Sequence, residues 1–173
     1  INDYMTKPSD FGASIGRYAN RIGGATFELD GQTISLNKND GENCLHGGTE
    51  GWQYQVYEAE QVDPQTLKLT MVDPDGHMGF PGTVTAVVTY KLTDDNAIDI
   101  TYEGTTDKPT VLSMTNHAYF SLSGNHAEEG TDMILYVNAD TFTPANENLI
   151  PTGEMRPVEG TPFDFRTPKA IGQ

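Results

Sequence analysis

The chain has few basic residues, and that shortage excludes several classes of partner. Among its 173 residues, 10 are Lys or Arg and 25 are Asp or Glu, so the formal net charge is −15. A surface this acidic repels phosphate backbones and anionic lipid headgroups. Nucleic acids and membrane surfaces are therefore not expected as partners, and the charge favours a neutral substrate.

Cysteine and long apolar runs are also scarce. The one cysteine, Cys44, cannot form an intrachain disulfide or supply a Cys-rich zinc site. No apolar run approaches the roughly 18 residues that span a bilayer, and the first residues lack the basic-then-apolar pattern of a signal peptide. A cytoplasmic location is the default expectation. Because the chain begins at Ile1 rather than Met, the lack of a signal peptide does not exclude an exported parent protein.

Glycine and proline, by contrast, are frequent. The 18 Gly and 10 Pro residues stand mostly between short runs in which apolar and polar residues alternate, which is typical of a β-rich protein. No window of a dozen residues has the 3.6-residue period of an amphipathic helix. We therefore predict an all-β fold, and the length suits a single domain with a sizeable core.

Alternation and turn residues predict the individual strands. Asp30-Gly31 suits a type I′ turn, which requires positive φ at both positions, so a hairpin is predicted around it. Asp73-Pro74-Asp75-Gly76 predicts a second turn, and residues 84–92 and 98–102 predict an antiparallel pair. From Pro144 onward, five prolines predict only short strand pieces. Further strands are expected at 66–71, 111–120 and 133–137.

The segment 111–120 contains the residue best suited to acid–base chemistry, His117. Histidine exchanges a proton near neutral pH without a specially tuned environment. Alternation assigns Val111, Ser113, Thr115, His117 and Tyr119 to one face and Leu112, Met114, Asn116, Ala118 and Phe120 to the other. A strand that buries Leu112, Met114 and Phe120 and presents the first set resembles the floor of a ligand groove. A structural or surface histidine explains the same pattern.

Two other segments combine polar side chains with glycine. Arg17, Asn20 and Arg21 lie within seven residues, and His46 precedes two glycines. The planar fork of arginine and the paired donor and acceptor of asparagine suit the adjacent hydroxyls of a polyol. Arginines that form surface salt bridges, and a simple turn at His46, are the alternatives.

The remaining histidines, His77 and His126, lie in loops rich in turn-forming or polar residues, and solvent-facing side chains are expected there. A metal site built from His46, His77 and His117 is an alternative explanation of these histidines. No His-x-His or His-x-x-x-His spacing supports it, so no metal is expected.

Taken together, these segments resemble the aldose 1-epimerase (galactose mutarotase) family. The resemblance covers practically the whole chain, and its five segments follow the order of the family. They are 12–22 (GASIGRYANRI), 43–48 (NCLHGG), 73–76 with 79–82 (DPDG and GFPG), 115–120 (TNHAYF) and 149–154 (LIPTGE).

The resemblance implies a large antiparallel β-sandwich, the supersandwich of galactose mutarotase-like proteins. It also implies the interconversion of α and β anomers of aldohexoses such as galactose and glucose, without cofactor or metal. By the same resemblance, His117 is the general acid that protonates the ring oxygen. Asn20, Arg21 and His46 match sugar-binding positions, and Tyr119 lines the pocket. Arg17 stays open between a binding and a structural role.

The sequence departs from the family pattern at its ends. The family continues for roughly as long again after the position of Gln173, and that part carries the glutamate base and a sugar-binding aspartate. We therefore expect residues 1–173 to form a single truncated domain that is inactive alone and pairs with the missing C-terminal half or with itself. A non-catalytic carbohydrate-binding module of the same fold and a hexose-6-phosphate mutarotase relative are the alternatives.

Overall fold

The computed structural model describes residues 9–125 and 127–173, and the chain divides into two compact units, 1–118 and 119–173. The described residues form short β-strands and four 3₁₀ helices, which agrees with the all-β prediction, and none of these helices is long and apolar enough to cross a membrane. In the first unit the elements are β1 Ser14–Ile15, β2 Arg21–Ile22, η1 Gly23–Ala25, β3 Thr26–Leu29, β4 Gln32–Ser35, β5 Cys44–Leu45, η2 Trp52–Tyr54, β6 Glu58–Asp63, β7 Thr66–Asp73, η3 His77–Gly79, β8 Val84–Leu92, β9 Ile98–Thr106 and β10 Thr115–Asn116.

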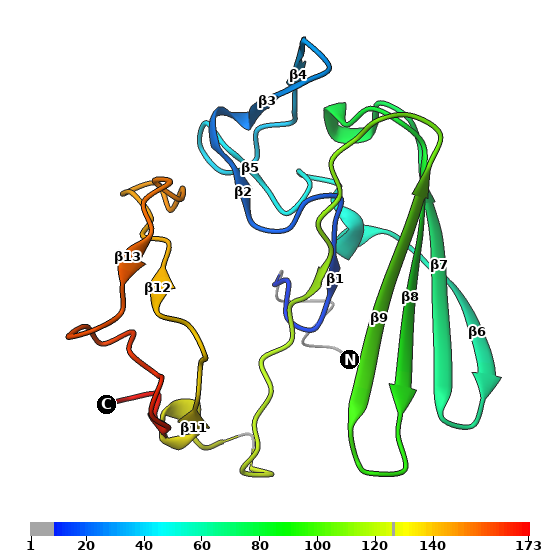
Figure 1. Ribbon diagram of the computed structural model, residues 1–173. Coiled ribbons are helices and arrows are strands. Elements are labelled where there is room, and N and C mark those ends of the chain that lie inside the picture. Colours follow the sequence, from blue (N-terminus) through cyan, green and yellow to red (C-terminus); the bar gives the residue numbers. More distant parts are fainter. Residues whose placement is uncertain (1–8, 126) are drawn as a thin grey trace. The chain divides into compact units, whose positions relative to one another are not determined.

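The largest sheet is antiparallel and has the order β6-β7-β8-β9 (Figure 1). Its register pairs Leu69 with Val88 and Val88 with Tyr102. Val84, Ala86 and Val88 of β8 are fully buried, as the apolar alternation predicts, whereas Leu92 on the same predicted face is exposed. Val84 and Ala86 pack with Trp52. The edge strand β6 was not predicted from the sequence. Its residues are all exposed, so no buried face imposes the alternation by which a strand is recognised.

The predicted hairpin forms between β3 and β4. Asp30 and Gly31 both have positive φ, at 51° and 77°, which is the backbone of a type I′ turn. The residues around this hairpin build a second core cluster, in which Ala25, Leu36 and Phe80 are buried together with Cys44. This cluster adjoins the segment that carries the candidate sugar-binding residues Asn20 and Arg21.

The segment 111–120 differs from its prediction. Its ladder, β10, is only two residues long and pairs Thr115 with Ile15 of β1. Met114 packs on the core as expected, but Leu112 and Phe120 are 39% and 59% exposed, so their predicted burial is wrong. Val111, predicted to face outward, packs on the cluster around Phe80. A pairing this short does not impose a two-residue period on the whole segment.

The second unit has only short ladders, as its prolines predict. Its described elements are η4 Gly130–Asp132, β11 Ile134–Leu135, β12 Thr141–Phe142, β13 Arg156–Pro157 and β14 Lys169–Ala170. β11 pairs with β14, and β12 pairs with β13. The strand expected at 133–137 is thus reduced to the two residues of β11. That the two units belong to one domain stays a prediction.

Candidate functional site

A pocket of about 480 Å³ lies in the first unit, beside the segment that contains β10. Its volume falls in the range of small-molecule sites, about 300 to 1,000 Å³. Six consecutive residues line one side of it, so this segment borders the pocket along its length rather than through alternate side chains. The lining residues are Ala19, Asn20, His46, Ser113, Met114, Thr115, Asn116, His117 and Ala118.

Two of the predicted site residues, His46 and His117, meet in this pocket. Their rings are 5.2 Å apart between centroids and lie nearly perpendicular, at 86°. His117 follows β10, and its backbone continues the pairing: its N–H donates to Ala13 O at 2.9 Å, and its carbonyl accepts from Gly12 N at 3.0 Å. The ladder between β1 and β10 therefore fixes the backbone position of His117.

His46 is locked to Asn20 by two hydrogen bonds. The backbone N–H of Asn20 donates to His46 Nδ1 at 2.9 Å, and the backbone N–H of His46 donates to Asn20 O at 3.0 Å. Because Nδ1 accepts, the proton of the neutral ring is carried by Nε2. Both residues have positive φ, 65° at Asn20 and 51° at His46. Asparagine and histidine adopt this conformation more readily than most residues.

Burial favours the neutral form of His46. Desolvation lowers the pKa of His46, the carboxylates of Asp10 and Asp40 oppose this shift, and the electrostatic influence of His117 and Arg21 adds to it. The neutral ring with its N–H on Nε2 is a hydrogen-bond donor. A neutral His46 is suited to donating a hydrogen bond to a sugar hydroxyl, rather than to protonating the ring oxygen of the sugar.

Arg21 lies at the edge of this group. It begins β2, which pairs with β5, so Arg21 is opposite Leu45 and next to Asn20. Its Nε donates to Asp40 Oδ2 at 2.7 Å, and its side chain is 18% exposed. This bond uses one of the five guanidinium donors and orients the group. Arg21 is not among the lining residues of the pocket, but its charge acts on His46.

The family model of aldose 1-epimerases matches residues 1–173. This chain belongs to the aldose 1-epimerase family. It is 42% identical over 168 residues to the aldose 1-epimerase of Escherichia coli K12, covering 97% of this chain and 48% of that protein. It is 39% identical over 173 residues to the galactose mutarotase of Homo sapiens, covering all of this chain and 50% of that protein.

Solved structures confirm the predicted fold. The GalM/aldose epimerase homologue from C. elegans superposes with a TM-score of 0.91 at 33% identity, over 99% of this chain and 52% of that one. Galactose 1-epimerase from Lactobacillus acidophilus gives a TM-score of 0.90 at 33% identity, over 99% and 51%. This aldose 1-epimerase family chain thus spans about half the length of the relatives that it matches.

Arg17 and His77, two further polar residues singled out in the sequence, do not line the pocket. Arg17 is buried and bonded to Asp73, which decides for its structural role. His77 was expected to face solvent, and that prediction is wrong. Its side chain is only 18% exposed, because its Nδ1 lies 2.6 Å from Asp73 Oδ1. Tyr119 is the first residue of the second unit and 74% exposed. Its place in the pocket stays a prediction, and His126 lies outside the described residues.

Asp10 is a site residue that the sequence analysis missed. Its charge raises the pKa of His46, and its Oδ1 accepts a hydrogen bond from Tyr54 Oη at 3.4 Å. The turn that it starts, with Ala13 N donating to Asp10 O at 3.1 Å, leads directly into the strand beside His117. No sequence signal identifies it, because it is separated from His46 by 36 positions and lies in a short polar segment typical of a turn.

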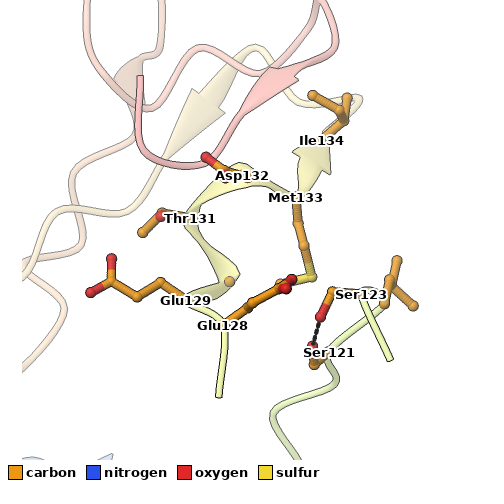
Figure 2. A pocket seen from close by; sticks show the side chains of 10 residues that line it. Ser121, Ser123, Glu128, Glu129, Thr131, Asp132, Met133 and Ile134 are labelled. Atoms are coloured by element: carbon orange, nitrogen blue, oxygen red, sulfur yellow. Dashed lines mark hydrogen bonds between the residues drawn. The ribbon is translucent and has the colours of Figure 1, made fainter. Parts of the chain in front are cut away.

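A larger hollow of about 670 Å³ lies in the second unit. It is acidic, but its carboxylates do not converge: Glu128 extends toward Met133, and Glu129 extends the opposite way (Figure 2). Ser121 and Ser123 form a hydrogen bond at 3.1 Å. Its described lining has no histidine or arginine. Within the described residues, no three His, Cys, Asp or Glu side chains come together as metal ligands.

Proposed function

We propose that this chain carries the acid and sugar-binding part of an aldose 1-epimerase, which interconverts the α and β anomers of aldohexoses such as galactose and glucose. The observation that supports this proposal most directly is the approach of the His117 and His46 rings to 5.2 Å in a pocket of small-molecule size, with Nδ1 of His46 accepting from the backbone N–H of Asn20. Family membership supplies the class of reaction.

The chemistry assigns different tasks to the two histidines. Opening a cyclic hemiacetal requires a proton delivered to the ring oxygen and a proton removed from the anomeric hydroxyl. His117 delivers the first proton, and each positioned acid or base contributes typically about 10²- to 10⁴-fold to the rate. Rotation about the bond between C1 and C2, followed by closure on the other face of the carbonyl, gives the second anomer.

The sugar hydroxyls are held by neighbouring donors and acceptors. His46 donates through Nε2, Asn20 offers an amide, and Arg21 offers its remaining guanidinium N–H groups from an orientation fixed by Asp40. Tyr119 completes the pocket in this proposal. The acidic surface and the single nearby arginine suit a neutral aldohexose better than a phosphorylated one.

We also propose that the 173-residue chain alone turns over sugar slowly or not at all. The carboxylates that act on His46 are Asp10 and Asp40. Asp10 accepts a hydrogen bond from Tyr54, and Asp40 accepts one from Arg21. In this proposal, neither carboxylate acts as the base that removes the proton of the anomeric hydroxyl. The base is then supplied by residues that match the other half of the relatives.

Association with that other half, or with a second copy, is part of the proposal. At the far end of the large sheet, Leu92 and Ile98 pair with each other and remain 53% and 57% exposed. Apolar strand ends of this kind favour a covering partner. A cytoplasmic location is proposed from composition, since the one cysteine is buried and a single cysteine cannot form an intrachain disulfide.

Polarimetry on freshly dissolved α-D-galactose and α-D-glucose tests the proposal. The chain is assayed alone and after addition of the C-terminal half of a relative, and galactose binding is measured by calorimetry in both samples. We expect binding in both and mutarotation only in the combined sample. Binding without mutarotation in the combined sample would favour the carbohydrate-binding module, and preference for hexose 6-phosphates would favour the third alternative.

A further inference from the structure

Asp73, the last residue of β7, accepts hydrogen bonds from three side chains, two of which are distant from it in sequence. Its Oδ2 accepts from Arg17 Nη2 at 2.7 Å, from Arg17 Nε at 3.0 Å and from Trp52 Nε1 at 2.9 Å. Its Oδ1 lies 2.6 Å from His77 Nδ1. Asp73 is 2% exposed, and Arg17 and Trp52 are 1% and 2% exposed. One buried carboxylate thus joins three segments of the first unit.

Of these three partners, Trp52 is uncharged. When His77 is also neutral, Arg17 alone balances the charge of Asp73. Arg17 spends its other donors on the loop that follows β7: its Nη1 donates to Pro81 O at 2.7 Å and to Gly82 O at 2.9 Å. A buried ion is stable only while its partner remains, because removing one member leaves the other charge desolvated and unpaired. Arg17 therefore depends on Asp73 for its position.

The position of Arg17 determines the start of the pocket. Its carbonyl accepts from Ser113 N at 3.0 Å, and Ala19 N donates to Ser113 O at 2.8 Å. Ser113 and Ala19 both line the pocket, and Asn20 follows Ala19 directly. The backbone that presents Asn20 to His46 is thus anchored two to three residues away from the buried ion pair.

Trp52 and His77 connect Asp73 to the loop that carries His46. Trp52 N donates to Gly16 O at 3.2 Å, and the indole ring covers Gly16 so closely that an added Cβ there would lie 2.1 Å from the ring. His77 Nε2 lies 3.4 Å from Glu50 Oε2 in the same loop. A Cβ on Gly47, the residue after His46, would lie 2.2 Å from Gly16 O, so this loop has little room to move.

We propose that Asp73 is the positioning residue of the sugar pocket, holding through Arg17 and Trp52 the two segments that lock Asn20 onto His46. The role of the pocket in sugar binding rests on the proposed function, whereas the dependence of the Asn20–His46 lock on Asp73 does not. Asp73 does not touch the substrate. It acts by fixing which nitrogen of His46 carries the proton and where that nitrogen points.

The test compares Asp73→Asn with Asp94→Asn, an identical change at an exposed aspartate that bonds Gln65. The ¹⁵N shifts of the His46 ring report its tautomer in the unliganded chain, and calorimetry with D-galactose reports binding. Trp52 is the one tryptophan of the chain, so its fluorescence reports the cluster directly. Far-UV circular dichroism verifies that each variant is folded.

In Asp73→Asn we expect the tautomer preference of His46 to be lost, the emission of Trp52 to shift, and galactose binding to weaken about tenfold, equivalent to about 1.4 kcal/mol. The Asp94→Asn variant should match the parent in all three. An unchanged His46 tautomer and unchanged galactose affinity in a folded Asp73→Asn chain overturn the inference. If the parent chain binds no galactose but Asp73→Asn still changes the His46 tautomer, the proposed function is overturned and the inference stands.

If Asp73→Asn does not fold, two variants of His77 take its place. His77→Asn keeps an N–H donor close to the position of Nδ1, and His77→Ala removes it. We expect His77→Ala to disturb the His46 tautomer and His77→Asn to restore most of the parent spectrum. Equal spectra for the two variants and the parent would show that the Asp73 cluster does not position the pocket.

Discussion

The cluster around Asp73 and the pocket around His117 use the same residue types for opposite purposes. The cluster contains an arginine, a histidine and an aspartate, and at the edge of the pocket Arg21, His46 and Asp40 supply the same three residue types. In the cluster, Arg17 donates to Asp73 and to backbone carbonyls, and both nitrogens of His77 face carboxylates. At the edge of the pocket, Arg21 uses one donor on Asp40, and in the pocket His46 uses its Nδ1 on the backbone N–H of Asn20.

The difference shows what separates a structural polar group from a binding group in this fold. Arg17 is 1% exposed, and its donors are consumed inside the first unit. Arg21 is held from one side, in a place that solvent reaches. Oriented groups that retain donors toward a pocket are the ones that can bind a polyol. The predictions below test this contrast, beginning with the largest effect.

Removing the buried carboxylate should cost the most stability. We expect Asp73→Asn to lower the free energy of unfolding by about 3 to 5 kcal/mol, because it leaves Arg17 charged and unpaired in the interior. Urea denaturation followed by Trp52 fluorescence measures the change. Asp40→Asn, which breaks the half-exposed pair with Arg21, should cost about 1 kcal/mol or less. Equal losses in the two variants would remove the contrast between cluster and pocket.

Removing the proposed acid should have the largest effect on rate. In a full-length enzyme that contains this segment, we expect His117→Ala to lower kcat about 10²-fold or more and to change KM little, because ring-oxygen protonation matters in the transition state. Polarimetry at saturating galactose measures kcat. The unfolding curve of His117→Ala should overlay that of the parent, unlike that of Asp73→Asn.

Arg21→Ala should affect binding more than rate. Its contacts to sugar hydroxyls exist in both ground and transition states, so we expect KM to rise about tenfold or more with a smaller loss of kcat. Arg21→Lys serves as the matched control, since it keeps the charge but loses the planar fork. If Arg21→Ala instead lowered kcat as much as His117→Ala and left KM unchanged, the division of roles between the two residues would be wrong.

The features of the fold and the site that depend on neighbouring residues could be predicted from the sequence. Asp30-Gly31 specified its hairpin, and the alternation of β8 specified its buried face, because both signals depend on neighbouring residues alone. His117 and His46 were found through family motifs and are brought together by the structure. The role of Tyr119 rests on the motif alone.

The rest depended on contacts between distant residues. His77 was assigned to solvent because its glycine-rich loop explains a turn, and only the fold brings Asp73 and Glu50 to its two nitrogens. Asp10 was missed for the same reason. Leu112 and Phe120 were predicted to be buried on the basis of a long strand, whereas the ladder in the segment 111–120 is only the two residues of β10.

The smallest expected effect concerns Asp10, and it tests whether the pocket tolerates charge changes that the cluster does not. The carboxylate of Asp10 raises the pKa of His46, against the larger lowering by burial. Asp10→Asn should therefore lower the pKa of His46 further and keep its ring neutral to a lower pH. Because the folded pKa of His46 is below its unfolded value, the stability from this group is fully present above the unfolded pKa and is lost as pH falls through the folded pKa. By lowering the folded pKa further, Asp10→Asn extends this loss to lower pH and makes it larger. An NMR titration of the His46 ring, with Asp94→Asn as control, measures the shift. An unchanged or raised pKa of His46 in Asp10→Asn would mean that the carboxylate of Asp10 does not stabilise the charged ring.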